Sequence, residues 1–204
     1  TGGIAQLARR LQDTLRQPVR IMSTTGPMAG AVMKSLPVDT LYQPMMHRSD
    51  NFFAEQILMM ASSQRYDEID SRRVIKYMLD SLLNDLPHPP NWVDGSGLSR
   101  FNLFTPRDMV SVLGKMMKAY PKERLFPLFP SGGKGTLRNY YQALPNRLYA
   151  KTGTLNGVVA LSGYMITKSG KTLIFSVLVN NHNTTSTNVR RAVERFLVRT
   201  ANAG

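Results

Sequence analysis

The residues best suited to chemistry in this sequence are Lys151, Thr152 and Gly153, which lie in an apolar and β-branched run. A lysine in apolar surroundings is costly unless it meets an anion, and the neighbouring threonine hydroxyl can donate to the same carboxylate. Glycine lets a ligand or another backbone approach closely. The tripeptide is therefore suited to hold a carboxylate beside a strand edge, where a bound peptide can pair as an extra strand. Alone, however, the tripeptide is more typical of a surface lysine and a turn glycine.

A second candidate, Ser49-Asp50-Asn51, stands at the expected start of a helix. By itself it fits an ordinary N-cap, because these residue types are favoured there. In a functional reading, Ser49 offers a hydroxyl for proton relay and Asn51 offers a side-chain amide for a peptide carbonyl. Both readings stay open on these three residues.

A longer glycine-rich motif runs from Asp94 to Leu103 as Asp-Gly-Ser-Gly-Leu-Ser-Arg-Phe-Asn-Leu. It is followed by a clean helix start, with Thr105 as N-cap, Pro106 at the first helical position and Asp108 in the first turn. Locally the motif is a turn before a capped helix. Its length makes it more discriminating than either tripeptide.

The remaining polar candidates form no comparable pattern. His47, His88 and His182 lack metal-ligand spacing, so we expect structural or surface roles, with a minor part for His47 in shaping a site around Ser49. The pattern Ser-x-x-Lys occurs once, from Ser131 to Lys134. A nucleophile and its base are placed by one helical turn, and the two intervening glycines disfavour a helix. We therefore predict a loop there, and neither a metal nor a cofactor.

Apolar periodicity predicts the elements that must position these residues. Helices are expected at about 3–16, 50–62, 71–85, from 106 onward and at about 186–200, and weak strands at 18–22 and 30–33. The expected inward residues are Val74, Ile75, Met78, Leu79, Leu82 and Leu83, then Met109, Val110, Leu113, Met116 and Met117, and finally Val189, Val193, Phe196 and Leu197.

The last part of the chain changes to strand character. Runs at 148–155, 158–167 and 171–180 predict a three-stranded antiparallel meander. Asn156-Gly157 predicts a type I′ hairpin turn, which needs two positive φ angles. The third run barely alternates, so we expect it to be covered on both faces. Helices, then a meander, then a helix define an α+β class.

Composition describes an ordinary globular protein of 204 residues with 42% hydrophobic and 19% charged residues. It has no cysteine, hence no disulfide or thiolate metal site, and no apolar run long enough to cross a bilayer. The net charge is +13. The densest basic group, Arg190, Arg191, Arg195 and Arg199, lies on the last helix and fits a solvated face. A non-catalytic module that binds an anionic polymer stays an alternative, whereas we do not expect a nucleic-acid partner.

The motifs resemble a known family when they are read together. Serine penicillin-recognising enzymes use Ser-x-x-Lys, Ser-x-Asn and Lys-Thr-Gly in that order, and Ser49-Asp50-Asn51 and Lys151-Thr152-Gly153, about 100 residues apart, match the last two. With Asp-Gly-Ser-Gly-Leu-Ser and Gly135-Thr136-Leu137, residues 40–200 resemble the D-Ala-D-Ala carboxypeptidase/endopeptidase family, the class C low-molecular-mass penicillin-binding proteins. The family's Ser-x-x-Lys motif precedes the part that this chain matches.

This resemblance implies an incomplete penicillin-binding protein transpeptidase-like (β-lactamase-like) fold. Residues 1–40 would be the tail of an inserted domain, and 41–204 the C-terminal part of the DD-peptidase domain. The implied catalytic residues are Ser49, Asn51 and Lys151, and the implied substrate-binding residues are Thr152, Gly153 and Thr154. Ser49 would relay the proton to the leaving amine, Asn51 would bind the substrate amide, and the Thr154 N–H would furnish half of the oxyanion hole.

The resemblance also implies partners and a location. The substrates would be peptidoglycan peptides ending in D-Ala-D-Ala, β-lactams would acylate the full enzyme, and the protein would be periplasmic or otherwise extracytoplasmic. The isolated chain would be inactive without a nucleophile. A β-lactamase-like hydrolase is the alternative within the superfamily, and an unpaired sheet edge that a second copy could cover would favour a homo-oligomer.

Overall fold

The computed structural model describes residues 4–23, 36–66 and 68–204, and the chain divides into two units, Thr1–Ser35 and Leu36–Gly204. In the first unit, the predicted helix is confirmed as α1 (Ile4–Leu15), which has no buried residue. The strand expected at 18–22 is wrong, because 18–23 have no regular structure, and the one expected at 30–33 lies outside the described residues. That residues 1–40 are the tail of an inserted domain stays a prediction.

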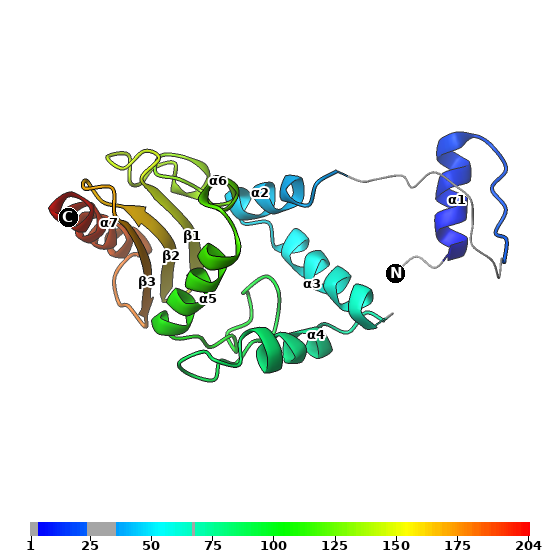
Figure 1. Cartoon of the computed structure of the whole chain (residues 1–204), viewed down its shortest axis with the longest axis horizontal. Helices are drawn as coiled ribbons and strands as arrows, with labels where there is room; N and C mark the ends of the chain where they lie inside the picture. The colour runs from blue at the N-terminus through cyan, green and yellow to red at the C-terminus, as the bar shows by residue number, and fades with distance from the viewer. Residues whose placement is uncertain (1–3, 24–35, 67) are drawn as a thin grey trace. The chain divides into compact units, whose positions relative to one another are not determined.

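The second unit begins with a helical region (Figure 1). Its elements are α2 (Asp39–Arg48), α3 (Asn51–Tyr66), α4 (Ser71–Tyr77) and a π-helical turn, η1 (Met78–Leu82). Asp70 is the N-cap of α4, and its side chain accepts from the backbone N–H groups of Arg72 and Arg73. Val74 and Ile75 are buried against Leu58 of α3, so these helices share a small core.

One inward residue was predicted wrongly in this region. Leu82 is 53% exposed, although a continuous α-helix over 71–85 would turn it inward. The helix changes at Met78 to the wider π-helical spacing, in which hydrogen bonds join residues five apart. That change rotates the following residues away from the face that Val74 and Ile75 define.

The predicted helix start before α5 (Pro106–Ala119) is confirmed, and Thr105 and Asp108 form a capping box there. Thr105 accepts from the Asp108 backbone N–H, and the Asp108 side chain accepts from the Thr105 backbone. Asp108 is fully buried and also accepts from the backbone N–H of His88 at 3.0 Å. Burial alone would raise the pKa of Asp108, but hydrogen bonds from Thr105 and His88 outweigh it and lower the pKa from 3.8.

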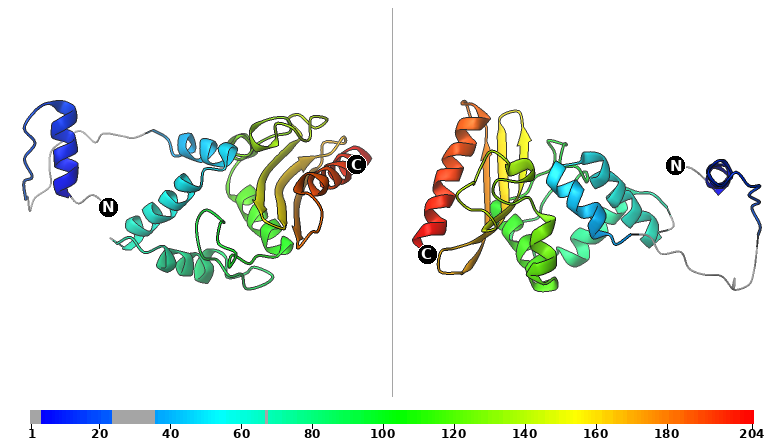
Figure 2. Two further views of the ribbon diagram at one scale, coloured as in Figure 1. Left: turned by 180° about the vertical axis from the view of Figure 1, so that it is seen from behind. Right: turned by 90° about the horizontal axis from the view of Figure 1, so that it is seen from above.

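The predicted meander is confirmed as a sheet in the order β1-β2-β3. Its antiparallel strands are β1 (Leu148–Leu155), β2 (Val158–Ile166) and β3 (Thr172–Asn180). The register pairs Lys151 with Ser162. α5 packs against β2 and β3 on one face, and α7 (Ser186–Ala203) covers the other face (Figures 1 and 2). The α+β class is therefore confirmed, with a sheet between helical layers.

Alternation along the strands divides the core into two clusters. Leu148, Ala150, Leu161 and Met165 pack with Leu197 and Ala201 of α7. On the other face, Tyr164 packs with Leu113, Phe126 and Phe129, and its hydroxyl donates to the Leu113 carbonyl at 2.9 Å. β3 contributes to both clusters, as expected: Leu173 and Phe175 pack on the α7 side and Ile174 on the α5 side. Phe196, expected inward, is 54% exposed because α7 buries its neighbour Leu197 instead.

The first hairpin has the predicted length but not the predicted turn. Leu155 pairs with Val158, so Asn156 and Gly157 form a two-residue loop. Only Gly157 has a positive φ, of 74°, whereas a type I′ turn needs one at both positions. The type I′ prediction is therefore wrong.

Short segments connect these elements. They are α6 (Lys122–Leu125) and the 3-10 turns η2 (Phe126–Leu128) and η3 (Gly135–Leu137). Across the described residues, none of the helices combines the length and the hydropathy that a membrane span requires.

The capping box gives a stability prediction. We expect Thr105→Val to lower the free energy of unfolding by about 1–2 kcal/mol at neutral pH, because the hydrogen bonds of the Thr105 hydroxyl with Asp108 and His88 are lost. Because folding lowers the pKa of Asp108, part of this stabilisation is present above pH 3.8. It is lost as the pH falls through the pKa of Asp108 in the folded protein. Urea unfolding at neutral and acidic pH should show that the difference in unfolding free energy between the wild type and Thr105→Val becomes smaller in acid. A difference that becomes larger in acid would contradict this assignment.

Candidate functional site

The two short motifs meet, although they lie far apart in the sequence. The Lys151 ammonium donates to the Ser49 hydroxyl over 2.6 Å between Nζ and Oγ, across 102 residues of chain. The same ammonium donates to the Thr152 carbonyl at 2.8 Å. One cation and one hydroxyl therefore face a common point between the helical region and the β1 edge.

Lys151 is held without a carboxylate. None of the ion pairs within the described part of the chain includes it, and its two acceptors are neutral oxygens. Burial lowers the pKa of Lys151 from 10.5, because a partly desolvated ammonium favours its neutral form. A half-buried cation with no counter-ion can attract an anionic ligand or exchange a proton with Ser49.

Ser49 has a different place from the one expected. It is the C-cap of α2, in the left-handed conformation with a φ of 56°, which costs a non-glycine residue free energy and is often found at functional sites. The N-cap of α3 is instead Asp50, whose side chain accepts from the Phe53 N–H at 3.0 Å. Asn51 is the first residue of α3 and is exposed, so its amide is open to a ligand.

Two neighbouring segments hold the end of α2 that carries Ser49. His47 bonds through Nε2 to the Pro127 carbonyl at 3.0 Å, which supports the expected role of His47 in shaping the site. Gly135 has a φ of 56°, and a Cβ there would lie 3.0 Å from the His47 carbonyl oxygen. The Gly-Thr-Leu segment thus needs its glycine to pack beside the serine motif.

The long glycine-rich motif is a turn organised by Asp94. Its carboxylate accepts from the Gly97 N–H at 2.6 Å, the Ser99 N–H at 2.7 Å and the Asn102 side chain at 2.9 Å. Asn102 in turn accepts from the Val93 N–H at 2.8 Å. These hydrogen bonds explain why aspartate and asparagine flank the motif.

Glu55 links this turn to α3, the helix that begins at Asn51 of the serine motif. Its carboxylate accepts from the Gly95 N–H at 3.2 Å and the Ser96 N–H at 2.9 Å. A Cβ on Gly95 would lie only 2.7 Å from the Ala54 carbonyl oxygen, so only glycine fits there. Sequence reasoning did not assign Glu55 a role. Its position one helical turn after Asn51 is the signal that could have suggested it.

The same turn also reaches the sheet. Arg100 donates to the Asn156 carbonyl in the β1–β2 loop at 3.1 Å. The motif therefore contacts both sides of the site, α3 through Glu55 and the hairpin through Arg100.

The β1 edge presents backbone groups beside Lys151. The Ala150 N–H donates to the Pro130 carbonyl at 2.9 Å, on the side away from β2. Because alternate residues of a strand point their N–H and C=O groups to the same edge, Thr152 and Thr154 also present theirs outward. The predicted loop at 131–134 is confirmed just beside this edge, with Ser131 buried and bridged to Tyr149.

Gly153 has a packing role in addition to its predicted one. A Cβ there would lie 3.2 Å from the Ala160 Cβ on β2. A side chain would thus crowd the neighbouring strand as well as any ligand.

The other histidines fit their structural expectation. His88 bonds to the Thr105 hydroxyl at 3.1 Å, and His182 to the Thr184 carbonyl at 2.8 Å. In the part of the chain that the structure describes, no cluster of His, Asp or Glu could hold a metal ion.

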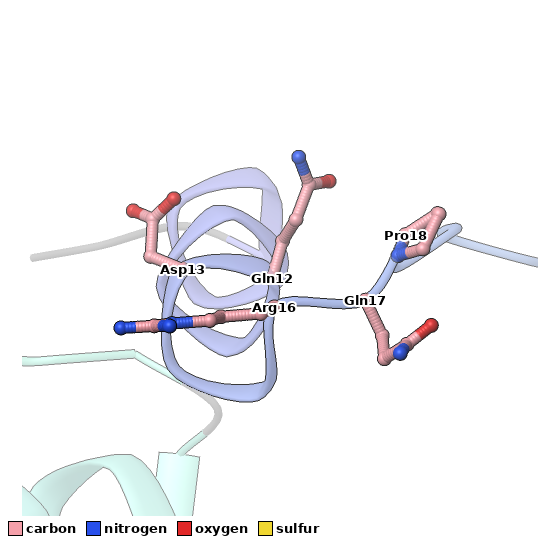
Figure 3. Close-up of a pocket in the computed structure, with 5 residues that line it drawn as sticks. All are labelled: Gln12, Asp13, Arg16, Gln17 and Pro18. Atoms are coloured by element: carbon pink, nitrogen blue, oxygen red, sulfur yellow. The ribbon is translucent and has the colours of Figure 1, made fainter.

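A shallow pocket in the first unit lies at the end of α1 (Figure 3). Its lining residues are Gln12, Asp13, Arg16, Gln17 and Pro18, all exposed. It contains none of the motif residues and gathers no set of groups for catalysis, so the candidate site rests on the convergence of side chains at β1.

Comparison with known proteins identifies the family of the chain. The model of the D-Ala-D-Ala carboxypeptidase 3 (S13) family matches residues 6–201, so the chain belongs to this family. It is 31% identical over 201 residues to the D-alanyl-D-alanine carboxypeptidase DacB of Haemophilus influenzae, covering 88% of this chain and 41% of that protein. The chain thus spans less than half the length of this relative.

Solved structures agree on the fold. Penicillin-binding protein 4 of Haemophilus influenzae, complexed with a β-lactam, superposes with a TM-score of 0.69 at 27% identity, over 96% of this chain and 49% of that one. A class A β-lactamase of Bacteroides cellulosilyticus superposes with a TM-score of 0.56 at 18% identity, over 82% of this chain and 64% of that one. The second likeness shows the fold alone. The chain therefore has an incomplete transpeptidase-like fold, as predicted.

The uncompensated ammonium gives a second stability prediction. We expect Lys151→Met to be at least as stable as the wild type near neutral pH, because it removes a half-buried charge without a counter-ion. The folded pKa lies below 10.5, so the protonated wild type is penalised at low pH and recovers as the pH rises through that pKa. Urea unfolding should therefore show the advantage of Lys151→Met shrinking toward alkaline pH.

The exposed Lys168 provides the control, and Lys168→Met should show no such trend. A loss of more than about 1 kcal/mol for Lys151→Met at every pH would contradict the prediction, since it would mean that the hydrogen bonds of the ammonium outweigh its desolvation.

The glycine-rich turn gives a third prediction, with a matched pair of variants. Gly95→Ala should lower the free energy of unfolding by about 1–3 kcal/mol, because its Cβ would press on the backbone of α3. Gly114→Ala in α5 should be neutral or stabilising by about 0.5–1 kcal/mol, since its Cβ would lie 3.8 Å from Ile174. Thermal unfolding of both variants tests this, and equal effects would contradict it.

Proposed function

We propose that this chain is the C-terminal part of a serine-type D-Ala-D-Ala carboxypeptidase/endopeptidase that acts on peptidoglycan stem peptides through an acyl-enzyme. The contact of 2.6 Å between Lys151 and Ser49 is the observation that carries the proposal. If Lys151 were only a surface lysine and Ser49 only a helix cap, the two motifs would have no structural reason to meet. Their contact therefore supports placing them in one site. A protein of this kind acts on the cell wall, so we propose an extracytoplasmic location.

In the proposed mechanism the nucleophilic serine and its lysine come from the family's Ser-x-x-Lys motif, which precedes the part of the family that this chain matches. The string at 131–134 fits the pattern but forms a loop. The serine attacks the carbonyl of the penultimate D-Ala, and the bond to the last D-Ala breaks as the acyl-enzyme forms. Ser49, hydrogen-bonded to Lys151, passes a proton to the leaving amine. Water then hydrolyses the ester and restores the serine.

The remaining residues bind and orient the substrate. The peptide lies along the β1 edge, where the outward N–H of Thr154 contributes to the oxyanion hole and Asn51 holds a substrate amide. Gly153 keeps the strand free of a side chain, and Thr152 binds the terminal carboxylate. The Lys151 ammonium supplies the positive potential that draws this carboxylate to the strand.

The proposal is tested by acylation with a fluorescent penicillin. The full-length enzyme that contains this chain should be labelled covalently, and Lys151→Ala should slow labelling by about 100-fold or more, because it removes both the proton relay and the potential. The isolated 204-residue chain should remain unlabelled. Labelling of this chain at Ser49 or Ser131, mapped by mass spectrometry, would overturn the assignment of roles.

A further inference from the structure

Arg190 contacts the last residue of the candidate substrate-binding strand segment. It lies in the second turn of α7, and its guanidinium donates to the Thr154 hydroxyl at 2.7 Å. This contact joins residues 36 apart in the sequence and comes from the face of the sheet opposite Ser49. The site thus has two cations, Lys151 on the helical side of β1 and Arg190 on the α7 side.

The charge of Arg190 is uncompensated, unlike that of its neighbour. Arg191 pairs with Glu194 at 2.6 Å and lies over the Tyr140 ring at 4.5 Å, so its guanidinium is already engaged by neighbouring side chains. Among the described residues, the ion pairs leave Arg190 without a carboxylate. A guanidinium has five N–H donors, and the contact with Thr154 uses one of them.

The strand presents further donors toward the same side. Thr152 and Thr154 are two residues apart, so their side chains share one face of β1, the face on which Ala150 packs toward α7. The Thr154 hydroxyl accepts from Arg190 and therefore keeps its own hydrogen free to donate. The backbone N–H groups of both threonines point to the open edge. Donors and one positive charge thus gather beside the edge along which the peptide is proposed to lie.

We propose that Arg190 is a specificity-determining residue that binds, together with the hydroxyls of Thr152 and Thr154, the carboxylate on the leaving D-amino acid. This inference rests on the proposed function and deepens it. A planar guanidinium matches a carboxylate with two parallel hydrogen bonds, which a lysine ammonium cannot supply. Lys151, hydrogen-bonded to Ser49, then supplies positive potential and proton transfer, whereas Arg190 supplies the directed hydrogen bonds to the carboxylate.

The proposal differs from a purely structural role in what it predicts for ligands. If Arg190 only fastened α7 to β1, its loss would weaken every ligand of the strand to a similar degree. If it binds the carboxylate, its loss weakens ligands with a free carboxylate and spares those whose C-terminus is an amide. The acid and amide forms of one peptide therefore separate the two roles.

The experiment titrates the isotopically labelled 204-residue chain with Nα-acetyl-D-Ala-D-Ala and with the C-terminal amide of that dipeptide, followed by NMR shifts of the Thr152 and Thr154 amides. The wild type should bind the acid more tightly than the amide. Arg190→Gln should lower the affinity for the acid form by about 10-fold and leave the affinity for the amide form unchanged, because one charge-assisted pair of hydrogen bonds is lost. Arg190→Lys should retain part of the preference.

Arg195→Gln is the matched control, since this exposed arginine lies on the same helix and the change in charge is identical. It should leave both affinities at the wild-type value. An equal loss for acid and amide in Arg190→Gln, an unchanged acid affinity, or a wild type that does not prefer the acid would each overturn the inference. If the proposed function itself is wrong, penicillin will not label the full-length enzyme at all, whereas labelling without a preference for the acid would overturn this inference alone.

Discussion

The site depends on a half-buried ammonium that has no counter-ion. Lys151 is held by two neutral oxygens, the Ser49 hydroxyl and the Thr152 carbonyl, and burial lowers its pKa. A lysine in this state destabilises the free protein relative to an apolar side chain, and a bound anion would remove that penalty. The free energy that the fold gives up at Lys151 would then be recovered when an anion binds beside it.

The helical region and the sheet must be fixed relative to each other for this contact to exist, and two kinds of link do so. Gly135 and His47 hold the end of α2 against the segments before the sheet. The turn organised by Asp94 contacts α3 through Glu55 and the β1–β2 loop through Arg100. Each link uses backbone groups or a glycine at close range, so the motifs that look like simple turns in the sequence are the parts that set the geometry of the site.

The sequence predicted most of the elements, because periodicity and capping are local signals. The helix start at Thr105 and the meander were confirmed within a residue or two. The wrong predictions come from features that local spacing does not record. The π-helical turn that exposes Leu82 changes which residues face inward, and the spacing of apolar residues does not reveal it. The left-handed Ser49 and the contact of Arg190 with Thr154 are tertiary properties, and no local pattern carries them. The roles of the six site residues, the domain assignment of 1–40 and a homo-oligomer stay predictions.

The two edges of the sheet differ in a way that bears on function. Beside β1, the outer backbone groups near Ala150 are paired with the segment at 130–132, and those of Thr152 and Thr154 follow at the site. The β3 edge carries an uncharged, mostly apolar strand whose residues from Thr172 to Val179 are only half-buried. Natural edges are usually blunted by charge or proline, and β3 has neither, so this edge is suited to pair with another strand. Among the described residues, some arginines pair with acids, as Arg124 does with Asp39, whereas Lys151 and Arg190 flank the open end of β1 without a carboxylate partner. Two cations without a carboxylate partner thus lie where a carboxylate-bearing peptide is proposed to bind.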